Sequence, residues 1–144
     1  MARQTLLTTK GLVHDVGGLN WGSNSTNHTR ILDAYIPIHS KTIKENTGLI
    51  PQKNVLQNIV LHWDDGVIMN GLFEGTYTEK STGNVYPKQI SSMSHKNTLG
   101  IYLRGRMGVL GTRKIIMADL VNYGRTHVDI IYLEGNNYSI DFHI

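Results

Sequence analysis

The feature that most constrains the fold is a series of short apolar segments separated by glycine or by Asn and Asp turns. The segments are too short for ordinary helices, and glycine and asparagine tolerate the positive φ angles that tight turns require. This pattern is typical of strands joined by hairpins and short loops. We expect seven strands, at residues 12–16, 34–38, 55–63, 67–73 with an extension to 78, 114–117, 129–133 and 138–142.

Two of the turns predict hairpins directly. Asp64-Asp65-Gly66 joins the apolar residues 59–63 to 67–69, and the Glu-Gly-Asn-Asn sequence at 134–137 joins two further apolar segments. Both turns place Gly or Asn where a tight hairpin requires positive φ. We therefore expect antiparallel strand pairs at these two positions.

Helical patterns are weaker, and we expect two short helices. Residues 97–107 carry four apolar side chains at helical spacing, although two internal glycines oppose a helix. Residues 117–124 are long enough for one or two turns that end at Gly124. Many short strands with two small helices favour a closed or nearly closed β-barrel, because closure hides the strand edges. A chain of 144 residues, 40% hydrophobic, is expected to form one domain, residues 1–144.

The charge distribution favours a polyanionic partner. The formal net charge is only +3, but the isoelectric point is about 9.2 and no Asp or Glu lies between Glu79 and Asp119. A solvated surface usually mixes both signs, so a stretch of one sign suggests contact with phosphate. The basic residues of this stretch are Lys80, Lys88, Lys96, Arg104, Arg106, Arg113 and Lys114.

Several classes of chemistry lack the residues that they require. The chain has no cysteine, which excludes disulfides and thiolate metal sites and suits a reducing cytoplasm. The 7 His are scattered, no Glu-x-Lys pattern of a metal-dependent nuclease occurs, and no apolar run is long enough to span a membrane. His39-Ser40-Lys41 with Asn46 differs from a phospholipase-D-like nuclease signature, which ends on Asp. We therefore expect no catalytic residue, no metal and no cofactor, and a cytoplasmic protein.

A long polar loop follows the first expected strand, at residues 20–30. Loops of this length are uncommon in compact domains unless they have a function. Its Asn, His, Ser, Thr and Arg side chains carry donors and acceptors that match base edges, and it contains no carboxylate. The alternative is a disordered surface loop. Trp21 is either a contact to DNA or, as we favour, a packing anchor of the loop against the barrel.

Six sequence strings, in this order and spacing, carry a resemblance to a known family. They are Gly-Leu-Asn-Trp-Gly at 18–22, Ala-Tyr-Ile-Pro-Ile at 34–38, the Asp-Asp-Gly hairpin at 64–66, and the segments 97–109, 122–129 and 138–142. Over residues 11–143 the chain resembles the DNA-recognition domains of type II restriction endonucleases of the EcoRII, BfiI and NgoFVII kind. The resemblance implies a mainly β fold, the seven-stranded open pseudobarrel of B3 transcription-factor domains, with two short α-helices.

The resemblance also implies two loops, the N-arm and the C-arm, that enter the major groove of DNA. The N-arm falls on residues 20–30, and its candidate contacts are Asn20, Trp21, Ser23, Asn24, Ser25, Thr26, Asn27, His28 and Arg30. The C-arm falls on residues 77–90, and its candidates are Tyr77, Thr78, Glu79, Lys80, Asn84, Tyr86, Lys88 and Gln89. Glu79 is either an acceptor for a cytosine amino group or an ordinary solvated acid.

Basic residues outside the arms are candidates for phosphate contacts, which position a protein without reading sequence. They are His95, Lys96, Arg104, Arg106 and Arg125, and the alternative for each is a solvated helix face.

The leading hypothesis is a sequence-specific double-stranded DNA-binding domain that serves a nuclease domain or subunit of a restriction system. If Met1 is the natural start, this domain lies at the N-terminus of its parent, as in the EcoRII layout. A stand-alone regulator is the nearest alternative. A carbohydrate- or small-ligand-binding β-barrel module, with Trp21, Tyr77 and Tyr86 as stacking platforms, does not explain the basic stretch. For a small hydrolase we find no nucleophile and base at a telling spacing.

Overall fold

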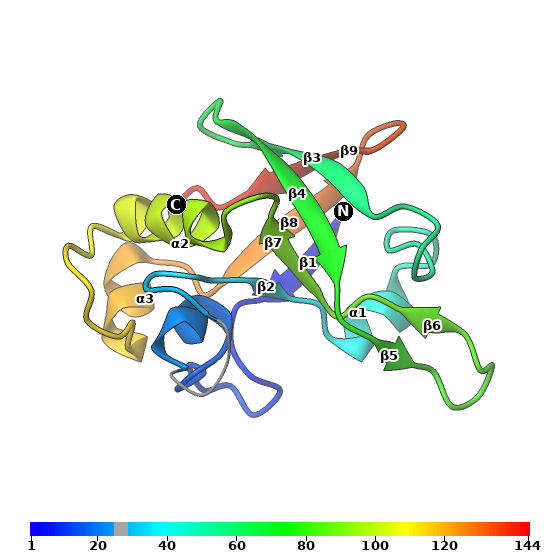
Figure 1. The fold of residues 1–144 in the computed structure, drawn as a ribbon, viewed down its shortest axis with the longest axis horizontal. Helices are drawn as coiled ribbons and strands as arrows, with labels where there is room; N and C mark the ends of the chain where they lie inside the picture. The colour runs from blue at the N-terminus through cyan, green and yellow to red at the C-terminus, as the bar shows by residue number, and fades with distance from the viewer. Residues whose placement is uncertain (25–28) are drawn as a thin grey trace.

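The computed structural model describes residues 1–24 and 29–144 and contains a seven-stranded sheet that curls into a nearly closed barrel (Figure 1). The strand order is β1-β8-β9-β3-β4-β7-β2, so that β1 and β2 form the two edges of one open seam. The expected fold class, a mainly β and nearly closed barrel with short helices, is confirmed. The strands are β1 (Ala2–Thr5), β2 (Ile36–Pro37), β3 (Asn58–Trp63), β4 (Ile68–Glu74), β7 (Gln89–Ser92), β8 (His127–Tyr132) and β9 (Asn137–Asp141).

Strand pairing is antiparallel except between β3 and β9, which run parallel with Val60 opposite Asn137. The two expected hairpins are confirmed. In the β3–β4 turn the amide of Gly66 donates to the carbonyl of Trp63 at 3.0 Å, with Gly66 at φ +90°. In the β8–β9 turn Leu133 donates to the carbonyl of Asn137 at 2.9 Å.

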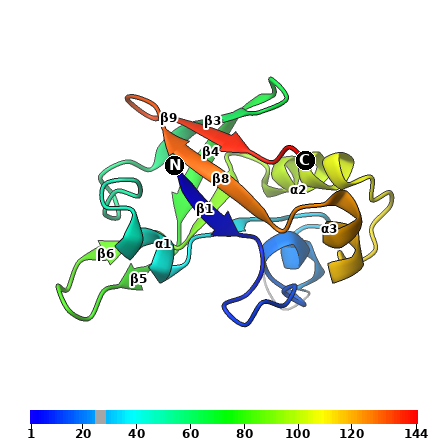
Figure 2. The same ribbon diagram turned by 180° about the vertical axis from the view of Figure 1, so that it is seen from behind.

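Five shorter elements lie outside the main sheet. They are the 3-10 helix η1 (Gly18–Ser23), α1 (Ser40–Glu45), α3 (Met117–Tyr123) and the two-stranded hairpin of β5 (Tyr77–Thr78) and β6 (Val85–Tyr86). The remaining helix is α2 (Lys96–Met107), which lies beside α3 (Figure 2). The two helices expected from the sequence are confirmed as α2 and α3, whereas α1 was not expected.

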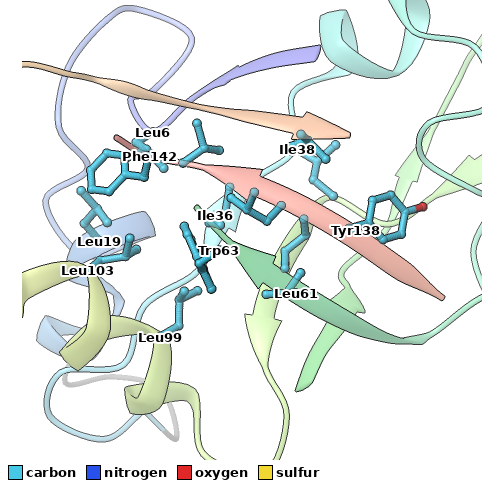
Figure 3. Close-up of a cluster of buried hydrophobic side chains, with 14 of the residues drawn as sticks. Leu6, Leu19, Ile36, Ile38, Leu61, Trp63, Leu99, Leu103, Tyr138 and Phe142 are labelled. Carbon is cyan, nitrogen blue, oxygen red and sulfur yellow. The ribbon is translucent and has the colours of Figure 1, made fainter. Parts of the chain in front are cut away.

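Alternating side chains of the strands fill the barrel with apolar groups. In β3 the residues Ile59, Leu61 and Trp63 point inward and are buried, while Val60 and His62 between them are half-buried. Leu99 and Leu103 of α2 enter the same cluster (Figure 3). Helix α2 therefore packs on the barrel through these two leucines.

The open seam is bridged by one polar side chain, Gln4 of β1, which is fully buried. Its Oε1 accepts hydrogen bonds from the amide of His39 at 3.1 Å and from the hydroxyl of Thr42 at 2.5 Å. Its Nε2 donates to the carbonyl of Thr5 at 2.8 Å. Gln4 thus connects β1 to the start of α1, which directly follows the other edge of the barrel.

Two expected strands are wrong. Residues 12–16 form no strand, because the Thr8 hydroxyl accepts from the amides of Lys10 and Leu12 and builds a local turn that leaves Leu12 61% exposed. Residues 114–117 are wrong as well, because the backbone of Ile115 bonds to a side-chain amide, that of Asn20, and not to a strand.

The remaining expected strands are confirmed with shifted ends: residues 55–57 precede β3, and only 36–37 of the segment 34–38 are strand. Three strands were not expected at all: β1, which is polar at three of its four residues, and β6 and β7, which lie inside the segment assigned to the C-arm.

Candidate nucleic-acid interface

The base of the N-arm is closed by backbone contacts around Gly22. Its amide donates to the carbonyl of Asp33 at 2.8 Å, and a Cβ on Gly22 would come within 2.6 Å of the carbonyl oxygen of Arg30. The Asp33 carboxylate accepts from the Arg30 amide at 2.8 Å. These contacts bring residues 22 and 30–33 together and fix the base of the N-arm.

Two residues assigned to the N-arm belong to this base. Asn20 is 2% exposed, and its side-chain amide bonds the carbonyls of His14 and Ile115 and the amide of Ile115 at 2.8–2.9 Å. A buried amide with three partners is not available to a base edge, so the assignment of Asn20 to base contact is wrong. Trp21 packs edge-to-face on Tyr35 with ring centroids 5.2 Å apart, in agreement with the favoured role as an anchor.

The outer part of the N-arm retains three described candidates. Ser23 and Asn24 are half-buried at the end of η1, and Arg30 is exposed. The hydroxyl of Thr29 donates to the carbonyl of Asn24 at 2.6 Å, which connects the two sides of the arm. The other four candidates, Ser25, Thr26, Asn27 and His28, lie outside the described residues.

Helix α2 supports the N-arm from behind at Gly100. An added Cβ at Gly100 would lie 1.8 Å from the carbonyl oxygen of Leu32, which has a φ of +68°. The amide of Ala34 also donates to the carbonyl of Lys96 at 3.3 Å. The internal glycine that weakens the helical pattern is therefore explained by this close approach.

The segment assigned to the C-arm begins with the β5–β6 hairpin and its connecting turn. The amide of Glu79 donates to the carbonyl of Asn84 at 2.8 Å, and the Glu79 carboxylate accepts from the hydroxyl of Thr82 at 2.9 Å. Tyr77 and Tyr86 pair across the hairpin and pack partly against the core. Lys80 is exposed at the turn.

The C-arm is shorter than the segment 77–90 assigned to it. Gln89 is the first residue of β7 and pairs with Pro37 of β2, and the next residue, Ile90, is fully buried. Lys88 is exposed at the foot of the hairpin, where its stem lies over Gly75. Both Lys88 and Gln89 thus belong to the surface between the arms.

A polar cluster around Glu74 joins three elements at this surface. The Glu74 carboxylate pairs with Lys96 at 2.7 Å and accepts from Ser91 at 2.5 Å and from Gln89 at 3.3 Å. Because a carboxylate accepts only, the amide group of Gln89 must direct its NH₂ toward Glu74. Lys96, expected to contact phosphate, is thus paired within the protein, while His95 beside it is exposed.

Three arginines expected to contact phosphate are used inside the fold. Arg104 is 5% exposed and donates to the carbonyl of Arg113 at 2.7 Å. Arg125 pairs with Asp129, and Arg106 of α2 pairs with Asp64 of the β3–β4 turn. Their guanidinium groups stabilise the protein itself, and we leave them out of the phosphate contacts proposed below.

Arg106 is the centre of a charged cluster with Asp64. It donates to the two carboxylate oxygens at 2.8 and 3.1 Å and to the hydroxyls of Tyr102 and Tyr123. Burial alone would raise the pKa of Asp64, but the hydrogen bonds from Arg106 and from the amide of Phe142 outweigh it, so the pKa lies below its usual value.

Asp64 also lies within 4.8 Å of donor atoms of Asp141 and His143, the three residues that among those described could share a metal ion. Arg106 and Arg125 already pair with the two carboxylates. We therefore interpret this cluster as a network of ion pairs within the protein.

The two arms lie on the same side of the barrel. In Figure 1 η1, the unlabelled blue helix, and the β5–β6 hairpin both lie below the sheet, on either side of β2. Figure 2 shows the same arrangement from behind. Between them is an open cavity of about 300 Å³ lined by residues of the N-terminal loop, β2 and its flanks, and β7. Its histidines, His14 and His39, and Tyr35 were not expected at the interface. Tyr35 lies within the Ala-Tyr-Ile-Pro-Ile string and His39 directly follows it, whereas no sequence signal marked His14.

A nearly closed pseudobarrel with two segments projecting from one side defines the class of B3-like DNA-binding domains. Residues 2–134 match the family described as the NgoFVII C-terminal B3-like DNA-binding domain. The chain belongs to this family, and the resemblance seen in its sequence is confirmed. The comparison with curated proteins found no match. Within the described residues, no helix is both long enough and apolar enough to cross a membrane.

Proposed function

We propose that this domain recognises a specific short sequence in double-stranded DNA, with the N-arm and the C-arm in the major groove. It serves as the target-recognition module of a restriction endonuclease in the cytoplasm, cleaves nothing itself, and acts with a nuclease domain or subunit. The single observation that carries the proposal is the position of both projecting segments on one side of a barrel of this DNA-binding family.

The exposed charges near the arms support this orientation toward DNA. Arg30 at the N-arm, Lys80 at the tip of the C-arm and Lys88 at its foot are all exposed cations. The nearest carboxylates are used locally: Asp33 accepts from an amide at the base of the N-arm, and Glu79 accepts from hydroxyls of its own turn. These hydrogen bonds leave both carboxylates charged, but Asp33 is only 5% exposed, so exposed cations outnumber exposed carboxylates at the two arms.

The contacts divide into two kinds. We assign base reading to Arg30, Lys80 and the outer N-arm, because these groups project from the barrel as major-groove contact requires. We assign backbone contacts to Lys88 and His95, which lie closer to the barrel surface. Asn84 in the turn of the C-arm and Gln89 on the surface between the arms remain candidates for base contact.

The experiment that tests the proposal is selection of bound duplexes from a random pool with the purified chain. We expect a short consensus, followed by binding without cleavage when the consensus duplex is incubated with Mg²⁺. A pool without a consensus would contradict sequence-specific recognition. Metal-dependent cleavage by the pure chain would contradict the non-catalytic role.

The carbohydrate-binding alternative loses support because its stacking platforms are packed. Trp21 contacts Tyr35, while Tyr77 and Tyr86 pack against the core. Salt dependence separates the two functions: DNA affinity should fall steeply between low and moderate salt, whereas sugar affinity should barely respond.

A further inference from the structure

The cavity between the arms collects cationic and titratable groups from three parts of the chain. His14 comes from the N-terminal loop, His39 follows β2, and Lys88 precedes β7. The amide of Ile38 donates to the carbonyl of Lys88 at 2.9 Å, which fixes the backbone next to His39 beside the lysine. The other lining residues are Thr8, Thr9, Tyr35, Pro37, Ile38 and Gln89, so that the lining contains no carboxylate.

The charges around His39 on its other side are mixed. His39 also borders a groove toward β1 and α1 that contains Arg3, Lys41 and Glu45. Asp15, the acid nearest in sequence to His14, pairs with Lys114 at 2.6 Å. The cavity itself is thus lined by three basic side chains with no acid among them.

The two histidines differ in their ability to hold a charge. Nδ1 of His14 is buried without a hydrogen-bond partner, so an imidazolium there would bury an unsatisfied N–H. The pKa of His39 also lies below its usual value because of burial. Its hydrogen bond to the backbone of Leu7 favours the charged form and offsets part of this effect. His39 is therefore the better acceptor of a proton.

We infer that this cavity is a binding site for one backbone phosphate of the DNA, held by Lys88 and by a protonated His39. The inference rests on the proposed function and adds a third contact surface between the two arms. A phosphate placed between two cations favours the imidazolium form. DNA binding then takes up a proton at His39, and by linkage the affinity rises as the pH falls.

The test measures the dissociation constant for the consensus duplex at about pH 8 and pH 6 at constant salt. We expect wild type to bind about threefold or more tightly at the lower pH, since one proton changes affinity by at most about tenfold per pH unit. Because His95 is also assigned to a backbone contact, the comparison is made in a His95→Asn background, where His39→Asn should remove this pH dependence. His62→Asn is the matched control, because His62 of β3 bonds Asn137 of β9 and lies outside the cavity lining. This variant should keep the pH dependence of binding.

Duplexes with a single neutral methylphosphonate identify the phosphate. In the His95→Asn background, at one position the substitution should remove the pH dependence, and it should have no further effect once His39→Asn is added. Lys88→Gln should lower the salt dependence of binding by about one counterion. A pH dependence that persists in His39→Asn, or that no methylphosphonate removes, would overturn the phosphate site while leaving DNA recognition intact. Failure of wild type to select any duplex would overturn the proposed function and this inference together.

Discussion

At the residue scale, two glycines of the same helix have opposite surroundings. A Cβ on Gly100 would meet the Leu32 carbonyl at 1.8 Å, whereas a Cβ on Gly105 has no atom within 4 Å. Gly100→Ala should therefore lower the free energy of unfolding by about 1–3 kcal/mol through overpacking against the N-arm base. Gly105→Ala should raise it by about 0.5–1 kcal/mol through helix propensity. Chemical denaturation of both variants checks this; equal effects would show that the close approach is not present.

Arg106 and Lys88 separate stability from DNA contact. Arg106→Gln leaves Asp64, whose side chain is 17% exposed, without its cation and should cost about 1–2 kcal/mol of stability, less than in a fully buried pair. Below its melting temperature this variant should bind DNA with the salt dependence of wild type, unlike Lys88→Gln. Denaturation and binding titrations at several salt concentrations test both statements. A lowered salt slope for Arg106→Gln would return this residue to the phosphate contacts.

Single residues also show where sequence reasoning fails. Asn20 has a side chain that could contact a base edge. In the fold, however, its amide bonds the backbone N–H and carbonyl of Ile115, as a neighbouring strand would. Arg104, Arg106 and Arg125 have the charge of phosphate contacts, yet each finds an acceptor far along the chain or on another element. The residue type predicts which hydrogen bonds and ion pairs a side chain can form, and the tertiary fold determines which partner it binds.

At the element scale, the N-arm is built as an insertion on a fixed base. The base contacts of Gly22, Arg30 and Asp33 are outside residues 24–29, and η1 is anchored through Asn20 and Trp21. Replacing residues 23–29 with a short Gly-Ser linker should therefore leave the melting temperature nearly unchanged and abolish discrimination between consensus and random DNA. Thermal denaturation and competition binding measure the two effects.

The outcomes that contradict this prediction differ in meaning. Unfolding of the replaced variant would show that the segment contributes to the core. Full specificity would place recognition in the C-arm alone, and Lys80→Ala would then be expected to lose about 1–3 kcal/mol on the consensus duplex.

Elements with a local signal could be predicted, and elements defined by distant partners could not. The two hairpins carry their turn residues, and α2 and α3 carry helical spacing and terminal glycines. By contrast, β1 is recognisable only from β8, and β7 was hidden within the C-arm because its partners are β4 and β2. The segments assigned to the two arms came from the family resemblance. The cavity between them is lined by residues far apart in the sequence, and no local pattern predicts that they meet.

At the scale of the whole molecule, stability and DNA binding should respond to pH in opposite directions. Burial lowers the pKa of His14, His39 and His127, so between these pKa values and about 6.5 the unfolded chain binds more protons than the native one. The free energy of unfolding should therefore fall as the pH drops from about 8 to 5.5, while DNA affinity rises.

A second loss should follow in acid. The hydrogen bond from Arg113 lowers the pKa of Asp119, and the pKa of Asp64 is lowered as described above. A depressed carboxyl pKa contributes stability above about pH 4 that disappears as the pH falls through the native pKa. Urea denaturation at about pH 8, 5.5 and 3.5 measures both steps, and a flat profile between pH 8 and 5.5 would show that the histidines are not held neutral.

The pairing of β1 with β8 ties the completion of the DNA-facing surface to the order of synthesis. Ala2 pairs with Ile130, so the first strand of this domain can pair only after the residues up to β8 have been synthesised. Contacts this distant in sequence form slowly. Gln4 of that strand holds the backbone of His39, and through it one wall of the cavity between the arms. A nascent or truncated chain without β8 therefore lacks the strand that pairs with β1, and this wall of the cavity is completed only when translation of the domain has passed β8.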